Sequence, residues 1–438
     1  MIIVSILVMI LIFTVLVVVH EWGHYIAARI FKIKVNEFSI FMGPKIFSRV
    51  GKKTGTVFSI RCLPLGGYCA LEGEEKTEDT EGSFCNKPWW QRTILLLAGV
   101  FMNFVLAIVI ITVIFLINGY TTREVSVVSE HLPISVVGLE PGDSIVDYND
   151  YSVFNSMDFN LINYAVNLDK SNITVEKANG TEEEYIFDRT ISKKDDNKSG
   201  SSTIKISKIL DGKSVYIADY IAKWQTNNLN IQINYSDKTS KVYDFKATND
   251  GNFTSLLKVT DENGNITESE PYTSKEVESV MKYYSPTKFG FSFKAVKDGN
   301  IFECIGNAFI YNVSLIKSVF NSIQWLITGR LGLDAMSGPI GITTVVDDVV
   351  KADASLSSRI LTLMEMGALI SANLAAFNLL PIPGLDGGKL VFIIIELIRR
   401  GKKVPPEKEA MISFVFLALL ILFSIFIAGN DILRIIRS

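Results

Sequence analysis

Four long apolar runs constrain this 438-residue chain more than any other feature of its sequence. They cover residues 2–19, 93–117, 360–398 with interruptions, and 411–428. A helix of about 18 or more mainly apolar residues is long enough to cross the hydrocarbon core of a bilayer. The first run lacks a basic start and a small-residue cleavage pattern, so we do not interpret it as a signal peptide. The runs predict a multi-pass α-helical membrane protein with four transmembrane helices.

The distribution of Lys and Arg predicts how the chain crosses the membrane. Basic residues crowd residues 29–61, after the first run, and residues 399–403, after the third. Short loops with such an excess of basic residues stay in the cytosol. We therefore expect both loops to be cytosolic, and the N-terminus, the long middle region and the short C-terminal tail to lie outside.

Two regions between the runs have β-type patterns. Residues 54–71 alternate between apolar and polar side chains and turn at Pro64, Gly66 and Gly67, which is typical of a β-hairpin. Residues 118–297 are rich in Asp, Asn, Ser, Thr and Lys and contain short β-type runs. The expected fold class therefore includes a cytosolic-side, membrane-associated β-hairpin region and an inserted extracytoplasmic β-rich region.

Within the inserted region, a weak internal repeat suggests two small domains. Predicted hairpins at residues 171–191 and 227–248 each follow a stretch that we interpret as a short helix, "FNLINYAVNL" and "YIADYIAKW". The polar segment 192–202 is the predicted linker between them. Residues 301–328 have mixed polar and apolar faces, which favours an interfacial helix on the outer membrane surface.

The end of the first apolar run carries ionisable residues, in the stretch "VVVHEWGHYIAARIF". His20 and His24 are four residues apart, so a helix presents both on one face, with Glu21 beside them. The pattern H-E-x-x-H on a helix binds zinc through the histidines and uses the glutamate as a general base. Ionisable groups at membrane depth cost several kcal/mol by most estimates and usually mark a functional site.

A catalytic zinc ion usually has three protein ligands and one open position. His131 is one candidate for the third ligand, but it belongs to the region predicted to lie outside. Asp386, in "NLLPIPGLDGGKL", is the better candidate. Pro381, Pro383 and the neighbouring glycines must break the helix there, and broken backbone at membrane depth is tolerated where it lines a cavity or packs on protein.

The predicted depths of the two motifs agree. His20 lies twelve residues before Lys32, and Asp386 lies thirteen residues before Arg399. Both basic residues mark the cytosolic boundary. At about 1.5 Å per helical residue, the two motifs lie roughly 18–20 Å from that boundary.

These residues predict a hydrolytic zinc site. We expect His20, His24 and Asp386 to hold Zn²⁺, which would lower the pKa of a bound water and polarise a substrate carbonyl. Glu21 would take the proton from the water and pass it to the leaving amine. Asn378 would donate a hydrogen bond to the substrate backbone or to the oxyanion.

The two motifs together resemble the site-2 protease family of intramembrane zinc metalloproteases. "HEWGH" at residues 20–24 is similar to the HExxH of this family, and "NLLPIPGLDGG" at residues 378–388 is similar to its NxxPxPxLDGG. "EFSIFMGPKIF", "LPLGGYCALEGE" and "SGPIGI" also resemble stretches of the family. The second run departs from the family pattern because Val100 stands where proline is usual, while Asn103 is kept, so we expect a minor effect.

A further stretch resembles a PDZ domain. "GLEPGDSIVDYNDYSV" at residues 138–153 is similar to a PDZ sequence in which Leu139, Pro141, Gly142 and Asp143 shape the loop before a strand. This indicates the subgroup of bacterial regulator of sigma-E proteases, the RIP metalloproteases, which carry PDZ domains between the second and third spans.

The resemblance implies a protease in the bacterial cell membrane whose active site opens toward the cytosol. Its expected substrates are single-span membrane proteins, such as anti-sigma factors or remnant signal peptides, trimmed first by an upstream site-1-type protease. The PDZ region would exclude untrimmed substrates. The residues implied to contact the substrate are Asn378, Pro381, Pro383, Gly66 and Gly67. We expect zinc as the cofactor, the lipid bilayer as the surroundings and no nucleic-acid partner.

The expected domain organisation combines the runs, the patterns and the resemblance. It comprises transmembrane helix 1 at 1–31, a cytosolic-side loop with the β region at 32–91, transmembrane helix 2 at 92–118, a PDZ domain at 119–194, a second PDZ-like or inserted β-rich domain at 195–297, an interfacial helix at 298–330, a connecting loop at 331–357, a broken transmembrane helix 3 at 358–398, a basic loop at 399–408, transmembrane helix 4 at 409–430 and a tail at 431–438.

Two other classes of function compete with the protease. A membrane zinc carrier would need repeated ligand sets along a path, and the sequence offers one site. A catalytically idle PDZ scaffold would normally have lost Glu21 or a metal ligand, and all are present. Replacing Glu21 with Gln separates the classes, since a carrier or scaffold should keep working while zinc is still held.

Overall fold

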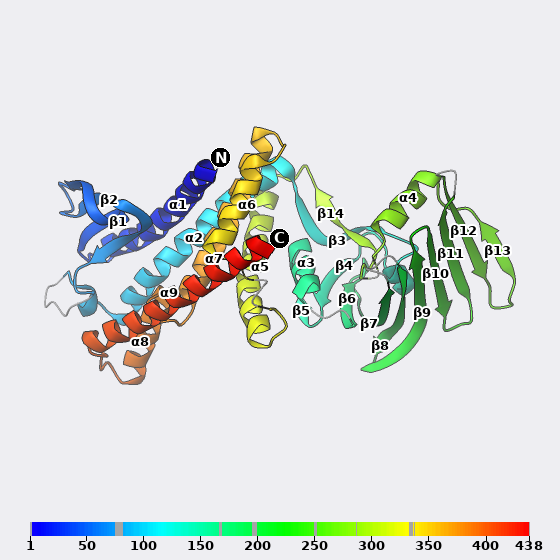
Figure 1. The fold of residues 1–438 in the computed structure, drawn as a ribbon. Helices are drawn as coiled ribbons and strands as arrows, with labels where there is room; N and C mark the ends of the chain where they lie inside the picture. Colours follow the sequence, from blue (N-terminus) through cyan, green and yellow to red (C-terminus); the bar gives the residue numbers. More distant parts are fainter. Residues whose placement is uncertain are drawn as a thin grey trace. The chain divides into compact units, whose positions relative to one another are not determined.

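The computed structural model describes residues 2–74, 82–165, 169–194, 199–248, 252–285, 287–332, 336 and 338–437. The chain divides into two compact units (Figure 1). Unit 1 consists of Met1–Gly119 together with Asp298–Ser438, and unit 2 consists of Tyr120–Lys297. The motifs that predict the metal site lie in unit 1.

Unit 1 is mainly helical. Its helices are α1 (Ile2–Ile30), α2 (Trp89–Asn118), α5 (Ile301–Ile327), α6 (Pro339–Lys351), α7 (Leu356–Leu379), α8 (Asp386–Ile398) and α9 (Pro406–Arg437), with a short 3-10 helix, η1 (Phe84–Asn86). Among the described residues, four helical segments are long and apolar enough to cross a membrane: Ile3–Ile30, Trp89–Asn118, Leu356–Leu379 and Glu407–Ile432. These four segments agree with the number of spans predicted from the apolar runs.

The third apolar run is broken, as the sequence predicts. Helix α7 ends at Leu379 and α8 begins at Asp386. A Cβ atom at Gly387 would lie 2.2 Å from the carbonyl oxygen of Leu380, and one at Gly388 would lie 2.3 Å from that of Ile382. The two glycines therefore let the start of α8 pack directly against the preceding backbone, which holds Asp386 at the first turn of the helix.

Two expected boundaries in unit 1 are wrong. The connecting loop predicted at 331–357 contains helix α6. The tail predicted at 431–438 instead continues α9 to Arg437. One contact explains both differences, because Asp431 on α9 accepts hydrogen bonds from the backbone N–H groups of Gly338 (2.9 Å) and Gly341 (2.8 Å) at the start of α6. Ser337, the first residue of "SGPIGI", lies outside the described residues.

Helix α5 packs against α2 and α7. Its buried face includes Cys304, Ala308 and Asn312, and the side-chain amide of Asn312 donates to the carbonyl oxygen of Phe104, near the middle of α2 (2.8 Å). The mixed polarity that favoured an interfacial helix is therefore used in part for contact with other helices. Its position relative to a membrane surface stays a prediction.

A small sheet follows α1. It is formed by β1 (Val35–Val50) and β2 (Val57–Leu71), so the β region begins earlier than residue 54. In its register, residues 38–40 lie opposite both residues 58–60 and residues 67–69. The two long strands thus fold back on themselves, and residues 67–71 form one edge of the sheet.

Unit 2 is built around a long sheet. Its strands are β3 (Tyr120–Val128), β4 (Ser144–Tyr148), β5 (Tyr151–Ser152), β6 (Lys170–Glu176), β7 (Glu182–Lys194), β8 (Ser199–Leu210), β9 (Lys213–Gln225), β10 (Asn228–Tyr235), β11 (Ser240–Ala247), β12 (Phe253–Thr260), β13 (Ile266–Ser269) and β14 (Phe291–Val296). They are ordered β13-β12-β11-β10-β9-β8-β7-β6-β4-β3-β14, and β5 pairs with β4. The remaining elements are η2 (Pro133–Val137), α3 (Ser156–Ala165) and α4 (Ser274–Tyr283).

Two predictions for unit 2 are wrong. Within the predicted linker 192–202, β7 runs to Lys194 and β8 begins at Ser199, and these two residues pair, while residues 195–198 lie outside the described residues. The stretch "YIADYIAKW", interpreted as a helix, lies in strand β9. Ala218, Tyr220 and Ala222 alternate as buried residues there, because β9 pairs on both sides and tertiary contacts override local helix propensity. The stretch at "FNLINYAVNL" does begin in helix α3, and its residues 166–168 lie outside the described part.

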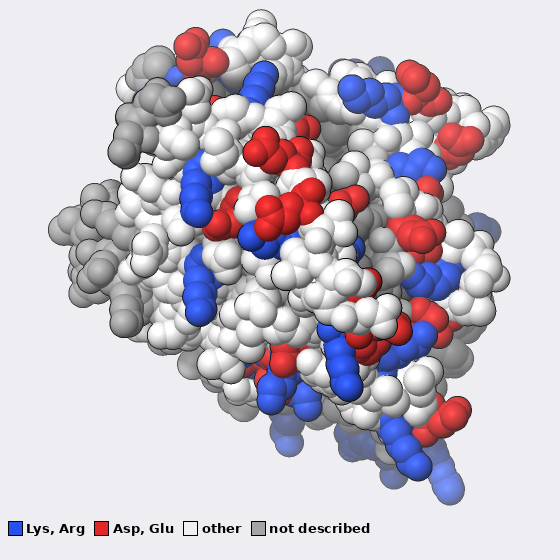
Figure 2. All heavy atoms as spheres, turned by 90° about the vertical axis from the view of Figure 1, so that its right-hand side faces the viewer, with Lys and Arg blue, Asp and Glu red and all other residues white. Residues whose placement is uncertain are grey.

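Continuous pairing of β6 through β9 also removes the expected break at residue 194. Residues 120–297 therefore form one compact unit. Figure 2 shows Lys and Arg side chains interspersed with Asp and Glu over the face that it draws. Such mixing of charges is typical of a solvated surface.

Candidate metal centre

The two histidines of the first motif lie one turn apart on α1, on the side that faces α2. His20 and His24 are each 7% exposed. Close approach of the two helices depends on two glycines. A Cβ atom at Gly23 would lie 2.3 Å from the carbonyl oxygen of Ala98, and one at Gly99 would lie 2.5 Å from His24 Nε2. The glycines of α1 and α2 therefore leave the space in which the imidazole rings sit.

The third predicted ligand joins the histidines from the other end of the chain. Asp386 Oδ2 lies 3.1 Å from His20 Nε2 and 3.3 Å from His24 Nε2, and the two Nε2 atoms are 3.2 Å apart. The ligand atoms of these three side chains all lie within 4.8 Å of one another, close enough for them to share one metal ion. Helices α1 and α8 thus bring together the two motifs that the sequence analysis paired by depth.

The donor set and its spacing fit zinc. Two atoms that each bind a tetrahedral zinc at about 2.0–2.1 Å lie roughly 3.3–3.5 Å apart. The three separations here are 3.1–3.3 Å, within a few tenths of an ångström of that value. Two imidazoles and one carboxylate are also ligand types that zinc accepts, and three protein ligands leave a fourth position for water or substrate. The residues present therefore fit the ion.

The remaining ring nitrogens face α2. His24 Nδ1 lies 2.9 Å from the carbonyl oxygen of Leu95. His20 Nδ1 lies 3.4 Å from the side-chain amide of Asn103, which is fully buried. Helix α2 therefore orients both imidazoles from the side opposite to Asp386. Asn103 belongs to a recognisable motif of the second apolar run, but no pattern in the sequence connects it, Gly99 or Leu95 with the histidines.

The predicted base and the predicted hydrogen-bond donor lie at the same site. Glu21 is half-buried, and its carboxylate interacts electrostatically with His24, His20 and Asp386. Asn378, in the last turn of α7, has its side-chain nitrogen 3.4 Å from His20 Nε2. A group bound between the three ligand atoms would therefore lie close to an amide donor.

The other expected substrate contacts lie in two short segments. Pro381 and Pro383 lie in the turn between α7 and α8. Gly66 has a φ of +74°, a conformation that glycine adopts at little cost. A Cβ atom at Gly67 would lie 3.2 Å from Val17 Cγ1, so the edge of the small sheet passes against α1 one turn before His20.

His131, the alternative third ligand, lies in unit 2. Its ring contacts the rings of Tyr243, Phe245 and Tyr272. Burial in this aromatic cluster lowers the pKa of His131 to about 4. It does not belong to the metal-ligand group found among the described residues, so the choice of Asp386 over His131 fits the geometry.

Two ion pairs hold α8 in place. Arg92 on α2, which is buried, forms a 2.7 Å ion pair with Glu396 on α8, whose side chain is 12% exposed. Lys389, one turn after Asp386, pairs with Glu74, which follows β2. These pairs connect the helix that carries the third ligand to α2 and to the segment after the small sheet. A basic residue three positions after Asp386 is the one signal for them in the sequence.

Comparison with known proteins decides the family. The model of peptidase family M50 matches residues 8–423. The chain belongs to this family. Family M50 is the site-2 protease family, so the protein is a zinc metalloprotease, as the two motifs predict.

Its relatives are similar over nearly their full length. A provisionally named zinc metalloprotease of Clostridium acetobutylicum is 28% identical over 428 residues, covering 98% of this chain and 97% of that protein. Zinc metalloprotease RasP of Shouchella clausii is 27% identical over 512 residues, covering 98% and 99%. Regulator of sigma-W protease RasP of Bacillus subtilis is 26% identical over 514 residues, with the same coverage. The apolar helices and the M50 family together indicate a membrane-embedded protease.

Proposed function

We propose that the protein hydrolyses peptide bonds within transmembrane segments of single-span membrane proteins. The observation that carries the proposal is the convergence of His20, His24 and Asp386 at 3.1–3.3 Å, because all three lie in or next to apolar helices. A hydrolytic site there acts on substrates that enter from the bilayer. The substrates that we propose are anti-sigma factors or remnant signal peptides, and the Bacillus subtilis relative is named a regulator of sigma-W protease.

In the proposed mechanism, His20, His24 and Asp386 would hold a zinc ion, which would supply a water of lowered pKa and polarise the scissile carbonyl. Glu21 accepts the proton of that water and returns it to the leaving amine. Asn378 donates its amide hydrogen bond to the carbonyl oxygen as negative charge develops. Leu95 keeps the ring of His24 oriented through its carbonyl oxygen.

We propose that the substrate binds in an extended form along residues 67–71. In the register of the small sheet, these residues pair with residues 35–40 and form an edge. An edge strand can pair with an additional extended segment through its backbone. Gly66 and Gly67 keep this edge free of bulky side chains beside α1. Hydrolysis needs an extended backbone, because a helix hides its peptide groups in internal hydrogen bonds.

We further propose that unit 2 contains a PDZ-type domain that controls access. Gly142, with a φ of +99°, and Asp143 form the loop before β4. Asp143 accepts hydrogen bonds from the N–H groups of Glu140 and Ala178 and from the ammonium of Lys177. Desolvation alone would raise the pKa of Asp143, but these three donors outweigh it and lower the pKa. The loop of the expected signature is therefore fixed by a buried carboxylate.

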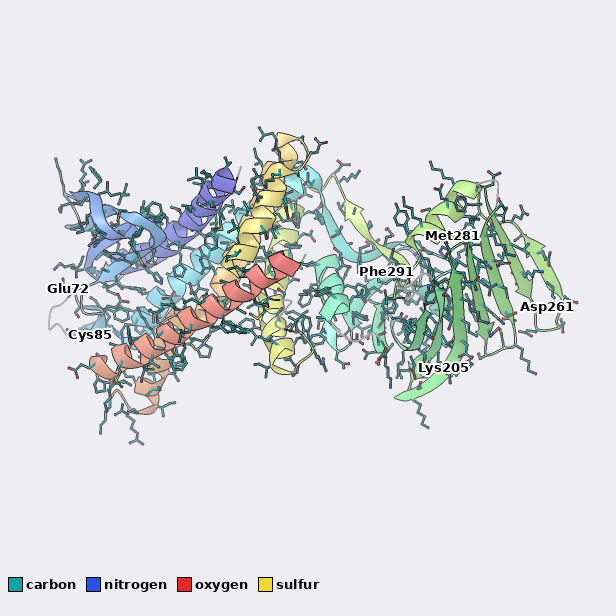
Figure 3. All side chains as sticks on the ribbon, in the orientation of Figure 1. Glu72, Cys85, Lys205, Asp261, Met281 and Phe291 are labelled. Atoms are coloured by element: carbon teal, nitrogen blue, oxygen red, sulfur yellow. The ribbon has the colours of Figure 1, made fainter. Side chains whose placement is uncertain are left out.

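The extent of the proposed PDZ-type domain differs from residues 119–194. Strand β14 pairs with β3 and is the last strand of the sheet order, so the segment after α4 completes this end of the sheet. A cavity of about 540 Å³ lies beside it, lined by Phe291 (labelled in Figure 3), Phe293 and residues of α3 and α4. PDZ domains bind a peptide as an added strand along such an edge, with pockets for its side chains.

The proposed orientation keeps residues 32–91 and 399–408 in the cytosol and unit 2 outside the cell. Its support is the excess of basic residues in those two loops. An upstream site-1-type protease would trim the outer part of the substrate before this enzyme acts. The cell membrane of a bacterium is the proposed location.

Glu21→Gln separates chemistry from metal binding. Purified full-length enzyme in detergent would be assayed for zinc content and for cleavage of a trimmed anti-sigma-like substrate. We expect Glu21→Gln to keep one zinc ion per chain and to lose at least 100-fold in activity, within the range for general-base catalysis. His24→Ala and Asp386→Ala should lose zinc as well. Unchanged zinc content in both ligand variants would contradict the proposed site, and unchanged cleavage by Glu21→Gln would contradict the role of the base.

A further inference from the structure

The two ligand histidines differ in how their second ring nitrogen is held. A histidine that binds a metal through Nε2 carries its proton on Nδ1, and that N–H group needs an acceptor. For His24 the acceptor is the backbone carbonyl of Leu95. For His20 the atom next to Nδ1 is the side-chain amide of Asn103, at 3.4 Å.

The amide of Asn103 has two orientations related by a half-turn, which exchange Oδ1 and Nδ2. With Nδ2 toward His20, the amide donates to Nδ1 and forces the ring proton onto Nε2, the atom that faces Asp386 and His24. That tautomer has no lone pair for a metal. With Oδ1 toward His20, the amide accepts from Nδ1–H, and Nε2 is free to bind.

The surroundings of Asn103 permit the second orientation. Asn103 is fully buried, and its Oδ1 accepts no hydrogen bond from the described residues, so a half-turn gives up no other bond to that oxygen. The backbone at this position is fixed independently, because Ser371 on α7 donates to the carbonyl oxygen of Asn103 (2.9 Å). The side chain is therefore held beside the ring while its amide remains able to rotate.

We propose that Asn103 is a positioning residue for His20, which accepts its Nδ1–H bond and so sets the tautomer that binds zinc. This inference rests on the proposed ligand set of His20, His24 and Asp386. Asn103 selects which nitrogen of His20 carries the proton and fixes the rotation of the ring. Removal of such a partner typically weakens metal binding 10–100-fold.

The test compares three variants of the full-length protein in detergent. Zinc affinity is measured by competition with a chelator, and the thermal unfolding midpoint of the metal-free form is measured in parallel. Asn103→Ala should weaken zinc binding roughly 10–100-fold. Asn103→Asp keeps an acceptor beside Nδ1 and should bind within about threefold of the wild type. Thr112→Ala changes another buried residue of α2, whose hydroxyl makes no hydrogen bond among the described residues and does not touch His20, and it should bind zinc normally.

The ring tautomer provides a readout that a purely structural role would not change. The chain has three histidines, so ¹⁵N-histidine NMR of the zinc-loaded protein resolves them, with His131 as an internal reference. Wild type and Asn103→Asp should show His20 protonated on Nδ1. The proposal is overturned if Asn103→Ala binds zinc with wild-type affinity, or if folded Asn103→Asp binds as weakly as Asn103→Ala. Failure of the ligand set itself is seen separately, as unchanged zinc binding in His24→Ala.

Discussion

Gly99 on α2 lies directly against the imidazole of His24, so that a Cβ atom at this position would come within 2.5 Å of Nε2 and 2.7 Å of Cε1 of His20. A contact shorter than about 3 Å forces the neighbouring atoms to move, and such overpacking of a protein interior lowers the free energy of unfolding by about 1–3 kcal/mol. The helix that supports the metal site therefore requires a glycine at this position.

Gly99→Ala should push both imidazoles away from Asp386. We expect weaker zinc binding and a loss of cleavage of at least tenfold, with the helical circular dichroism spectrum preserved. Gly429→Ala on α9 is the matched control, because a Cβ atom there meets no atom within 4 Å. Normal zinc affinity in Gly99→Ala would show that the rings adjust without cost.

Asp431 should stabilise the start of α6. Asp431 is 1% exposed and accepts from two backbone N–H groups, of Gly338 and Gly341. Asp431→Ala leaves both donors buried, which costs about 1–3 kcal/mol for each unsatisfied group. In Asp431→Ala, hydrogen exchange of the peptides that cover α6 should become faster. The control is Asp348→Ala, which removes an exposed carboxylate of α6 itself and should leave the exchange rate unchanged. Equal exchange in the two variants would refute the role of Asp431.

His131 should make unit 2 less stable in acid. Its pKa is about 4 in the folded protein and near 6.5 when exposed, so the unfolded state binds more protons between these values. The free energy of unfolding should be highest above pH 6.5 and should fall as the pH drops toward 4. The upper limit of this loss is about 1.4 kcal/mol per unit of pKa difference, and the actual loss should be smaller because the ring is partly exposed. In His131→Gln, thermal midpoints followed by circular dichroism should depend less on pH. A pH dependence equal to that of the wild type would exclude His131 as the cause.

Topology can be tested with single cysteines. The native cysteines, Cys62, Cys69, Cys85 and Cys304, are not disulfide-bonded among the described residues and would first be replaced by serine or alanine. Cysteines introduced at Lys52 and Lys402 should resist a membrane-impermeant reagent in intact cells. One at Asp261, labelled in Figure 3, should react, and so should one at Asn197, which lies outside the described residues. External labelling at Lys52 would reverse the proposed orientation.

Unit 2 should restrict access rather than contribute to chemistry. The metal ligands, Glu21 and Asn378 all lie in unit 1, whereas residues 120–297 form a separate compact unit. Replacing 120–297 with a short flexible linker should leave zinc binding intact and allow cleavage of full-length substrate. The comparison uses full-length and trimmed forms of one anti-sigma-like substrate. If the shortened enzyme cuts the trimmed form normally but still rejects the full-length form, unit 2 is a binding or sensing module instead.

Local patterns predicted much of the architecture. The apolar runs marked four helices because a span of about 20 residues must be apolar to cross a bilayer. The spacing of His20 and His24 put them on one helix face, and the prolines and glycines around Asp386 predicted the break between α7 and α8. The sequence also predicted that the two motifs meet, because each lies at a similar number of residues from the basic residues that mark the cytosolic boundary.

Tertiary structure decided what no local pattern encodes. The stretch at residues 216–224 has helix-forming residues but lies in β9, because neighbouring strands satisfy its backbone on both sides. The segment predicted as a linker became the β7–β8 hairpin for the same reason. Around the metal site, Gly99 and Asn103 are separated from His20 in the sequence by the end of α1, the small sheet and part of α2. Their roles depend on how α1 and α2 pack, because contact between distant segments follows from burial and shape across the whole unit, whereas the i, i+4 pattern of the histidines follows from the geometry of a single helix.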